Sequence, residues 1–533
     1  MRVLLALRAV TRRRLARLMD AWAARMAALT AAPHKPERAL DPLTPGDAEA
    51  ARAFAHGQLG QGALAVRWRS GSPFAATLGP LARDALYGFG WLDDAMAAEP
   101  EDAAALRSIA FDGLKRMARG AGPGWRADLA GSRVIAMAAA WPMLLRRADA
   151  RQKRALARAF GVHARFLERR MPAAPAGLPA LTAAAGLAAA GLVAGDRALA
   201  ARGGAAMGRA AEALIDGDGG VADRNPETLA TAAALIAWAV EAMTTAGAHP
   251  DPRLPTALIR AVGALRALRL GDGGLVRLHG ARAGDPAGLA LTLSRAAALT
   301  RSAGVQRRRE ACGAARVTAG RLTLLIDAAP PPPGPLATAS TLALAVSIGR
   351  ARLFDAIGPG WPLGGDWTLA ARATAAFCAV EIGGASSARL ASGGWAGRVL
   401  GRGFASGPTS VVFERAEDDD GHWVLAEHDG YRRRFGMMVR RRLFLARDGR
   451  DLRGEDAIAP ADPARPGPDR DFCVRFHLAP EIEARADGDA VALTLPDGAV
   501  WRFTAGGAPA RLAESVALDT PRGGPTAAQQ IVV

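Results

Sequence analysis

Cysteine is scarce in this sequence. The three cysteines, Cys312, Cys378 and Cys473, lie far apart, and none belongs to a C-x-x-C pair. A disulfide framework or a cysteine-bound zinc ion needs cysteines in pairs or at short spacings. The sequence therefore favours neither, and each thiol is expected to be a small buried apolar side chain.

Lysine and tyrosine are also rare, although the chain is strongly basic. Only three of its 68 basic residues are lysines, it has two tyrosines, and its formal net charge is +17. The arginines are dispersed in short runs such as Arg12–Arg14 and Arg432–Arg434, and no aromatic series is available to stack on bases. We therefore expect no specific nucleic-acid binding, whereas the charge is compatible with an acidic polysaccharide as partner.

Long apolar runs are missing too. No run reaches the roughly 18 uncharged apolar residues that a membrane-spanning helix needs. The N-terminal stretch MRVLLALRAV is interrupted by Arg8, and Ala-Ala-Pro at 31–33 is a poor end for a secretory signal. We favour a basic amphipathic helix over about residues 4–29. With no clear signal peptide, a cytoplasmic and a periplasmic or cell-envelope location both stay open.

The 533 residues exceed one ordinary hydrophobic core, so several domains are expected. Residues 1–45 are predicted to form the basic helix and a proline-rich linker. Residues 46–310 contain successive apolar stripes at helical spacing, separated by Gly, Pro and Asp, which predicts helices in antiparallel pairs. Residues 80–98 are expected to form one of these helices. This many paired helices favours an α/α toroid over a four-helix bundle.

The apolar period changes to two in residues 311–533. Short alternating runs, separated by Gly, Asp and Pro turns, predict an antiparallel β-sandwich. The change occurs in residues 321–358, which contain a strand pattern, the four prolines Pro330–Pro333, and two more strand patterns. Proline fits an extended link there, but not a helix or a central strand. The fold class is therefore α+β multidomain: a toroid followed by a sandwich.

Ten segments in a fixed order resemble one known family. They are WRADLAGSRVIAM (125–137), LERRMPAAPAGLPALTAAAGLAAAGL (167–192), DGDGGVADRNPETL (216–229), RLGDGGLVRLHG (269–280), TLLIDAAPPPPG (323–334), RATAAF (372–377), HDGYRRRFGMMVRRRLFL (428–445), DLRGED (451–456), RFHLAP (475–480) and ESVAL (514–518). Over about residues 50–533 the chain resembles the bacterial heparinase II/III-like polysaccharide lyases. The resemblance implies the same toroid-plus-sandwich fold.

The resemblance also implies a reaction. Such lyases cleave an acidic glycan next to a uronic acid by β-elimination. A donor must neutralise the uronate carboxylate, a base must remove the C5 proton, and an acid must protonate the leaving O4. By position in the family motifs, the implied catalytic residues are Asn225, His279, His428 and Tyr431. The implied substrate-binding residues are Arg224, Arg277, Arg432 and His477.

Each of these residues also has a structural interpretation. Asn225 precedes Pro226, as expected for the N-cap of a helix with proline in the first turn. Asp429-Gly430 predicts a hairpin turn, with His428 and Tyr431 packing across the strands. For His279, near the rim of the expected cleft, the structural interpretation is an exposed loop histidine.

The chain departs from the family at several catalytic positions. A Tyr-His pair expected after the R-N-P motif is Thr228 and Leu229, and the first-strand histidine motif is Ala337–Ser340. Two further expected histidines are Phe377 and Val439. No cofactor is expected. A zinc ion at His477, with Asp355, is a weaker hypothesis, because zinc needs three or four converging ligands.

Two functions follow. The first is a polysaccharide lyase whose active site is partly eroded. The alternative is a non-catalytic relative that binds or handles a glycan in its cleft. Neither the glycan nor the oligomeric state follows from the sequence.

Overall fold

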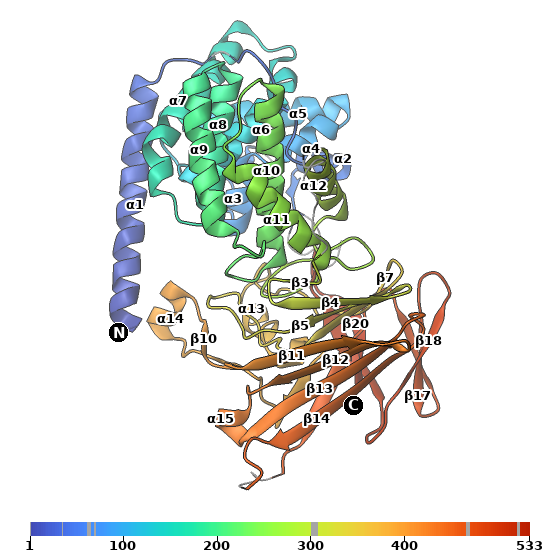
Figure 1. The fold of residues 1–533 in the computed structure, drawn as a ribbon. Helices are drawn as coiled ribbons and strands as arrows, with labels where there is room; N and C mark the ends of the chain where they lie inside the picture. Colours follow the sequence, from blue (N-terminus) through green and yellow to red (C-terminus); the bar gives the residue numbers. More distant parts are fainter. Residues whose placement is uncertain are drawn as a thin grey trace.

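The fold has a helical layer on one side and a β layer on the other (Figure 1). The structure is a computed structural model of the 533-residue chain, and it describes residues 2–34, 36–60, 65–68, 71–299, 308–464, 469–519 and 523–533. The predicted fold class, a helical toroid followed by an antiparallel β-sandwich, is confirmed.

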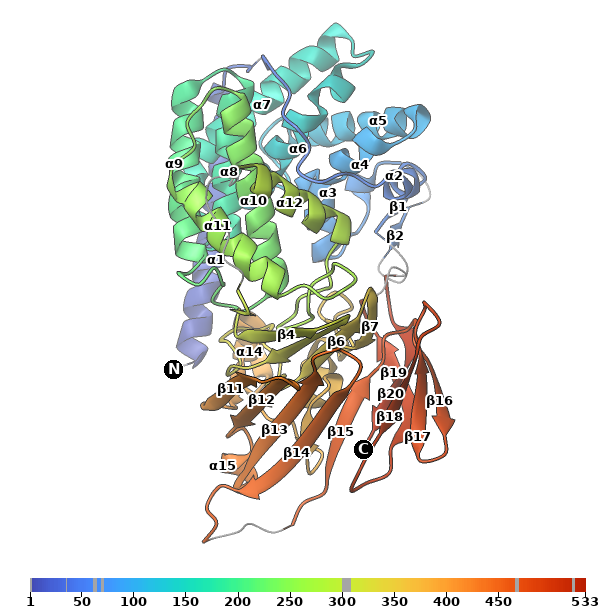
Figure 2. The same ribbon diagram turned by 45° about the vertical axis from the view of Figure 1, so that its right-hand side comes forward.

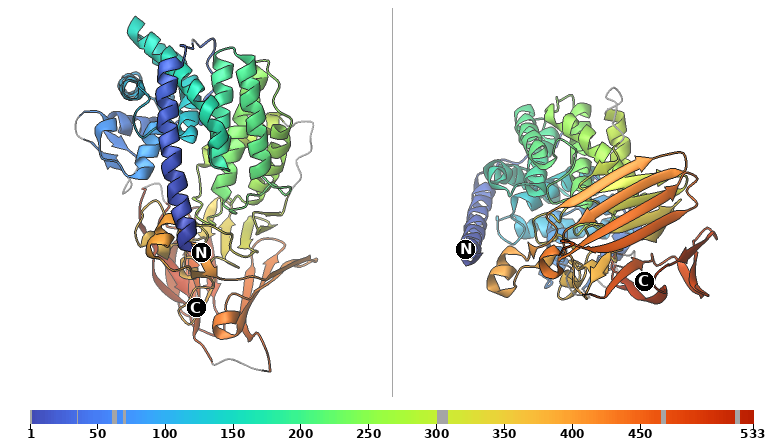
Figure 3. Two further views of the ribbon diagram at one scale, coloured as in Figure 1. Left: turned by 90° about the vertical axis from the view of Figure 1, so that its left-hand side faces the viewer. Right: turned by 60° about the horizontal axis from the view of Figure 1, so that its bottom comes forward.

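The helical layer is built from long antiparallel helices around an alanine- and leucine-rich core. Their bounds are α1 (Arg2–Thr30), α2 (Ala48–Ala55), α3 (Pro80–Gly88), α4 (Trp91–Ala97), α5 (Pro100–Met117), α6 (Ala127–Leu145), α7 (Ala150–Arg170), α8 (Leu178–Val193), α9 (Arg197–Leu214), α10 (Pro226–Thr245), α11 (Arg253–Ala267) and α12 (Pro286–Leu299). The first helix, α1, runs along the outside of this layer (Figure 3). Helix α10 is long and apolar enough to cross a membrane, but it lies largely buried among the other helices.

One predicted helix is two in the structure. Residues 80–98 were expected to form a single helix, but α3 ends at Gly88 and α4 begins at Trp91. Phe89 has a left-handed backbone with φ of 62°, which ends the helix. Its ring is fully buried against Trp91, with ring centroids 5.2 Å apart. Tertiary packing of this aromatic side chain therefore overrides the local helical pattern.

The β layer consists mainly of antiparallel sheets. The strands are β3 (Glu310–Ala311), β4 (Ala314–Ala319), β5 (Leu322–Asp327), β6 (Leu344–Ile348), β7 (Ala351–Phe354), β8 (Val380–Ile382), β9 (Arg389–Leu390), β10 (Phe404–Ser406), β11 (Val411–Glu417), β12 (Gly421–His428), β13 (Met437–Ala446), β14 (Leu452–Pro460), β15 (Phe472–His477), β16 (Glu483–Asp487), β17 (Ala490–Thr494), β18 (Val500–Thr504), β19 (Arg511–Ala517) and β20 (Thr526–Val532). Short helices α13 (Trp367–Ala370), α14 (Gly394–Leu400) and α15 (Arg432–Phe435) lie in the connections.

The sheet that touches the toroid is β3-β4-β5-β6-β7, and the sheet β11-β12-β13-β14 lies beyond it (Figure 2). Strands β5 and β6 are buried at every residue, because one face packs on the helices and the other on the outer sheet. The helical core continues into Leu325 and Ala345 of these strands. The two layers therefore share a packed boundary, where the family's active site is expected.

Candidate functional site

Asn225 begins α10 at the boundary between the layers. Its Oδ1 accepts hydrogen bonds from the backbone N–H groups of Glu227 (2.8 Å) and Thr228 (3.1 Å), so it caps the helix. Its Nδ2 donates to the carbonyl oxygen of His279 at 3.0 Å. Both polar atoms of this buried amide are thus held by protein groups, and neither points freely toward a substrate.

His279, whose carbonyl oxygen accepts from Asn225, is only 1% exposed. Its Nδ1 is 3.1 Å from Oγ1 of Thr338, and its Nε2 is 3.7 Å from Oδ2 of Asp327. Burial, with a smaller contribution from the nearby cation Arg224, lowers the pKa of His279 well below its usual value. The imidazole is therefore neutral and enclosed, and it is not a rim histidine.

Arg224 is bound by the protein itself. It forms an ion pair with Asp327 and donates to the carbonyl oxygens of Cys312 (2.8 Å), Ala329 (3.1 Å) and Pro330. Its guanidinium therefore joins the start of α10 to the end of β5.

Arg277 has a similar role in the loop before α12. It donates to Asp355 at 2.7 Å and to Asp519 at 3.1 Å. Two of the arginines assigned to substrate thus neutralise carboxylates of the chain.

His428 and Tyr431 lie in another part of the β layer. His428 ends β12, is 2% exposed, and its Nδ1 accepts from the N–H of Gly430 at 3.0 Å. Burial lowers the pKa of His428 to about 4.

Strands β12 and β13 pair as an antiparallel hairpin, as predicted, but Tyr431 is not on a strand, so the predicted cross-strand packing of His428 and Tyr431 is wrong. Strand β12 is followed by α15 before β13, and His428 pairs with Val439. The Tyr431 hydroxyl lies within donating distance of the carbonyl oxygens of Val380 (3.0 Å) and Ala385 (2.9 Å), and burial raises its pKa. Arg432 begins α15 and is exposed.

His477 lies on β15 and is 5% exposed. Its two ring nitrogens are 2.8 Å from Oγ of Ser515 and 2.9 Å from the carbonyl oxygen of Ala375. Burial lowers its pKa to about 4. In the described parts of the chain, no three His, Cys, Asp or Glu side chains converge so as to hold a metal ion.

The predicted site residues thus fall into separate local networks. Asn225 and His279 touch each other, with Arg224 linked through Asp327. Among the described residues, no hydrogen bond or ion pair joins His428, Tyr431 or His477 to that pair.

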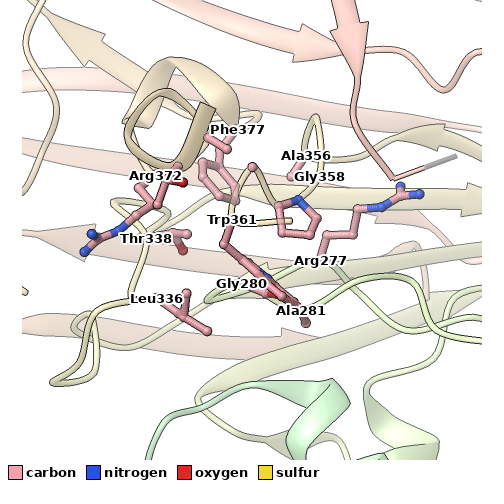
Figure 4. A pocket seen from close by; sticks show the side chains of 14 residues that line it. Arg277, Gly280, Ala281, Leu336, Thr338, Ala356, Gly358, Trp361, Arg372 and Phe377 are labelled. Atoms are coloured by element: carbon pink, nitrogen blue, oxygen red, sulfur yellow. The ribbon is translucent and has the colours of Figure 1, made fainter. Parts of the chain in front are cut away.

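A small pocket lies at the layer boundary where the family motifs meet (Figure 4). Thr338 and Phe377 line it, at two positions where the resemblance implies histidines. Its volume of about 20 Å³ is room for about one water molecule, not for a sugar ring.

Two residues that line the pocket were not predicted from the sequence. Trp361 closes the pocket by donating its Nε1–H to the carbonyl oxygen of Gly280 at 2.8 Å. Arg372 donates from Nε to Ala337 at 2.7 Å, while its buried Nη2 has no hydrogen-bond partner. Burial lowers the pKa of Arg372 to about 10. The only sequence signal for Arg372 was its place in the RATAAF motif.

Known proteins resemble this chain in sequence and in fold. A family model described as heparinase II/III-like, C-terminal, matches residues 304–533. FtsZ-localized protein C of Caulobacter vibrioides is 31% identical over 503 residues, which cover 89% of this chain and 82% of that protein. The chain belongs to the heparinase II/III-like family.

Solved lyase structures share the family fold. Heparinase III superposes with a TM-score of 0.68 at 10% identity, over 96% of this chain and 86% of that one. A mutant of the heparan sulfate lyase HepC from Pedobacter heparinus gives a TM-score of 0.58 at 12% identity, over 97% and 85% of the two chains. At this identity the likeness shows the fold alone.

Proposed function

We propose that this protein is a non-catalytic member of the heparinase II/III-like family. It binds the surface of an anionic membrane through α1 and localises there with FtsZ. One observation carries the proposal: α1 turns most of its large apolar side chains to solvent, and all of its buried residues are alanines. A surface helix of a soluble domain normally does the reverse.

The outward face of α1 carries an apolar stripe. Its members follow one another at spacings of three, four, seven or eight residues, which places them on one side of a helix. They are between 49% and 78% exposed: Leu4, Leu7, Leu15, Leu18, Trp22 and Leu29. An exposed stripe of this kind marks a surface that binds a partner or a membrane.

The inward face of α1 fixes this orientation. Ala23, Ala24, Ala27 and Ala28 are buried, and α7 is the long helix packed against α1. Asp20 adds a 2.6 Å ion pair with Arg170 of α7. Because small side chains and an ion pair hold this face, the apolar stripe cannot turn inward without breaking them.

Arginines make the stripe suited to an anionic bilayer in particular. Arg8, Arg12, Arg14 and Arg25 are all exposed and lie beside the stripe on the helix surface. Basic residues near an anionic bilayer each contribute about 1 kcal/mol of attraction, and their long stems let the charge stay in the headgroup layer. The combination is typical of a helix that lies in the membrane interface and does not span it.

The site geometry supports the non-catalytic part of the proposal. The histidines assigned to proton transfer are buried and neutral, the Tyr431 hydroxyl faces backbone carbonyls, and the pocket at the boundary is too small for a sugar. The alternative, β-elimination of a uronate glycan, rests on the fold. A fold hosts many functions, and the chemistry depends on the residues in the site.

The partner in the proposal comes from the relative. FtsZ-localized protein C is named for its localisation with FtsZ, and we extend that localisation to this chain. A fluorescent fusion in the source organism is then expected to gather where FtsZ gathers and to disperse when FtsZ is depleted.

Vesicle sedimentation tests the membrane part. The full chain is mixed with vesicles of phosphatidylglycerol and phosphatidylcholine in varied ratio. Bound protein is expected to increase with the anionic fraction and to decrease with salt, because the arginines supply the electrostatic attraction. Equal sedimentation without vesicles, or none at any anionic fraction, would contradict the proposal.

A further inference from the structure

A second surface lies far from α1, in the β layer, where two edge strands of different sheets lie. Strand β14 pairs with β13 on one side, and β18 pairs with β17 on one side. In the described part of the chain, neither strand has a partner along its other edge. Unpaired strand edges present rows of free N–H and C=O groups that another extended chain can bind.

A groove runs between these two edges. Strands β14 and β18 lie on either side of β15 in Figure 2. The groove has a volume of about 800 Å³, and both strands contribute to its lining. The lining is part apolar and part polar, and its large apolar side chains include Leu353, Phe354, Leu443, Phe476, Trp501 and Phe503. This size and lining are those of a ligand-binding cleft.

The groove is lined by more arginines than aspartates. Arg450, Arg453 and Arg502 are exposed at its rim. Asp456 is neutralised by Arg441, which donates to both of its carboxylate oxygens at 2.6 and 2.7 Å. Asp451 pairs with Arg453 at 2.7 Å, and Asp487 lies 3.6 Å from Arg502. Arg450 therefore projects positive charge at the end of the groove next to β14.

We propose that this groove binds an extended acidic peptide segment of a partner protein, which adds a strand to the free edge of β14. The free backbone groups of β14 supply the main-chain hydrogen bonds, and the aromatic floor takes alternate apolar side chains of the peptide. Arg450, which has no acidic partner among the described residues, selects a carboxylate of the peptide at its end of the groove. This inference is independent of the membrane proposal, since it concerns a different surface.

The occupant follows from the shape of the site. A helix has no free main-chain groups to pair with a strand edge, whereas an extended peptide pairs along its whole length. A basic segment would be repelled by the positive charge of Arg450. A second copy of this chain would have to place its own β14 or β18 in the groove. The sedimentation experiment below distinguishes such a dimer from a bound peptide.

A selection with random decapeptides displayed on phage identifies the preferred ligand of the full chain. Enriched peptides are expected to alternate apolar residues with Asp or Glu and to carry net negative charge. No enrichment, or enrichment of basic peptides, would overturn the proposal.

Variants then locate the binding. A labelled enriched peptide is titrated with the wild type, Trp501→Ala, Arg450→Glu and the control Arg485→Glu, which changes an exposed arginine of β16 outside the groove. Trp501→Ala is expected to weaken binding at least about tenfold, Arg450→Glu several-fold, and the control not measurably. Equal affinity for all four proteins would overturn the proposal.

Hydrogen exchange gives a readout of strand addition. Amides of β14 are expected to exchange more slowly when the peptide is bound, because they become hydrogen-bonded. Protection elsewhere with β14 unchanged would contradict edge pairing. A dimer in sedimentation that Trp501→Ala and Arg450→Glu both dissociate would show that a second copy occupies the groove, and the proposal would be wrong.

Discussion

The Arg224 guanidinium, at the start of α10, is paired with the fully buried carboxylate of Asp327, at the end of β5. Ser340 donates a second hydrogen bond to this carboxylate at 2.7 Å. The pair joins the toroid to the sandwich. A residue that the family motif offers as a substrate ligand is therefore part of the structural boundary.

Removing the cation is expected to destabilise the protein. Arg224→Met leaves the Asp327 carboxylate buried without its counter-ion, which typically costs about 3–5 kcal/mol of unfolding free energy. Urea denaturation followed by circular dichroism measures the loss. Arg224→Met combined with Asp327→Leu removes the uncompensated charge and should recover part of it. A loss below about 1 kcal/mol in the single variant would show that the pair is not needed for stability.

The two faces of α1 are expected to respond differently to mutation. Ala27 is fully buried, so Ala27→Leu overfills the contact with the protein and should cost about 1–3 kcal/mol. Leu15 is 58% exposed, so Leu15→Gln should change the free energy of unfolding by less than about 0.5 kcal/mol. Denaturation midpoints of the two variants measure both effects. A larger loss for Leu15→Gln would mean that the stripe packs against the protein.

Acid is expected to destabilise the β layer through its buried histidines. His428 and His477 have pKa values of about 4 when folded, against about 6.5 in an unfolded chain. Between these values the unfolded chain binds more protons, so the free energy of unfolding decreases as the pH falls from about 6.5 to about 4. Stability is fully retained above this window.

One substitution isolates this effect. His428→Asn keeps an acceptor for the Gly430 N–H but does not titrate, so the pH dependence of the urea midpoint should become shallower. His249→Asn, at an exposed position, is the control. An unchanged slope in His428→Asn would contradict the assignment.

Lyase activity is expected to be absent. Incubation with a panel of uronate glycans should give no rise in the ultraviolet absorbance of an unsaturated product, because no exposed base faces the pocket. An active lyase in the same buffer is the control for the assay. Product that forms with the wild type and is lost in Thr338→Val would place a working active site in this pocket.

Periodicity predicted the fold well because it reports directly on burial. Alternating apolar residues identified the strands of the sandwich, and the stripes identified the toroid helices. The break at Phe89 was missed, because a left-handed backbone at a phenylalanine follows from the packing of its ring and not from the local pattern. The short helix α15 between β12 and β13 was not predicted, because Asp-Gly indicates a turn but not the length of the connection.

The site was harder to predict, because the type of a residue does not reveal which groups its side chain will bond to in the folded protein. The sequence correctly offered Asn225 as a helix cap, and the structure adds its second bond to His279. No feature of the sequence predicted that His279, His428 and His477 would all be buried. The exposed stripe of α1 was visible as periodicity, but only the structure shows which face turns outward.

The most direct test of the account is the effect of the stripe on membrane binding. Leu15→Gln and Leu18→Gln together remove two exposed leucines from α1. The matched control is Leu81→Gln, at a leucine of α3 that is 52% exposed. On phosphatidylglycerol-rich vesicles, the α1 variant is expected to partition at least about tenfold less than the wild type, since each buried leucine contributes roughly 1.5–3 kcal/mol. The control should bind like the wild type. Equal binding of all three proteins would contradict the claim that α1 attaches this protein to membranes.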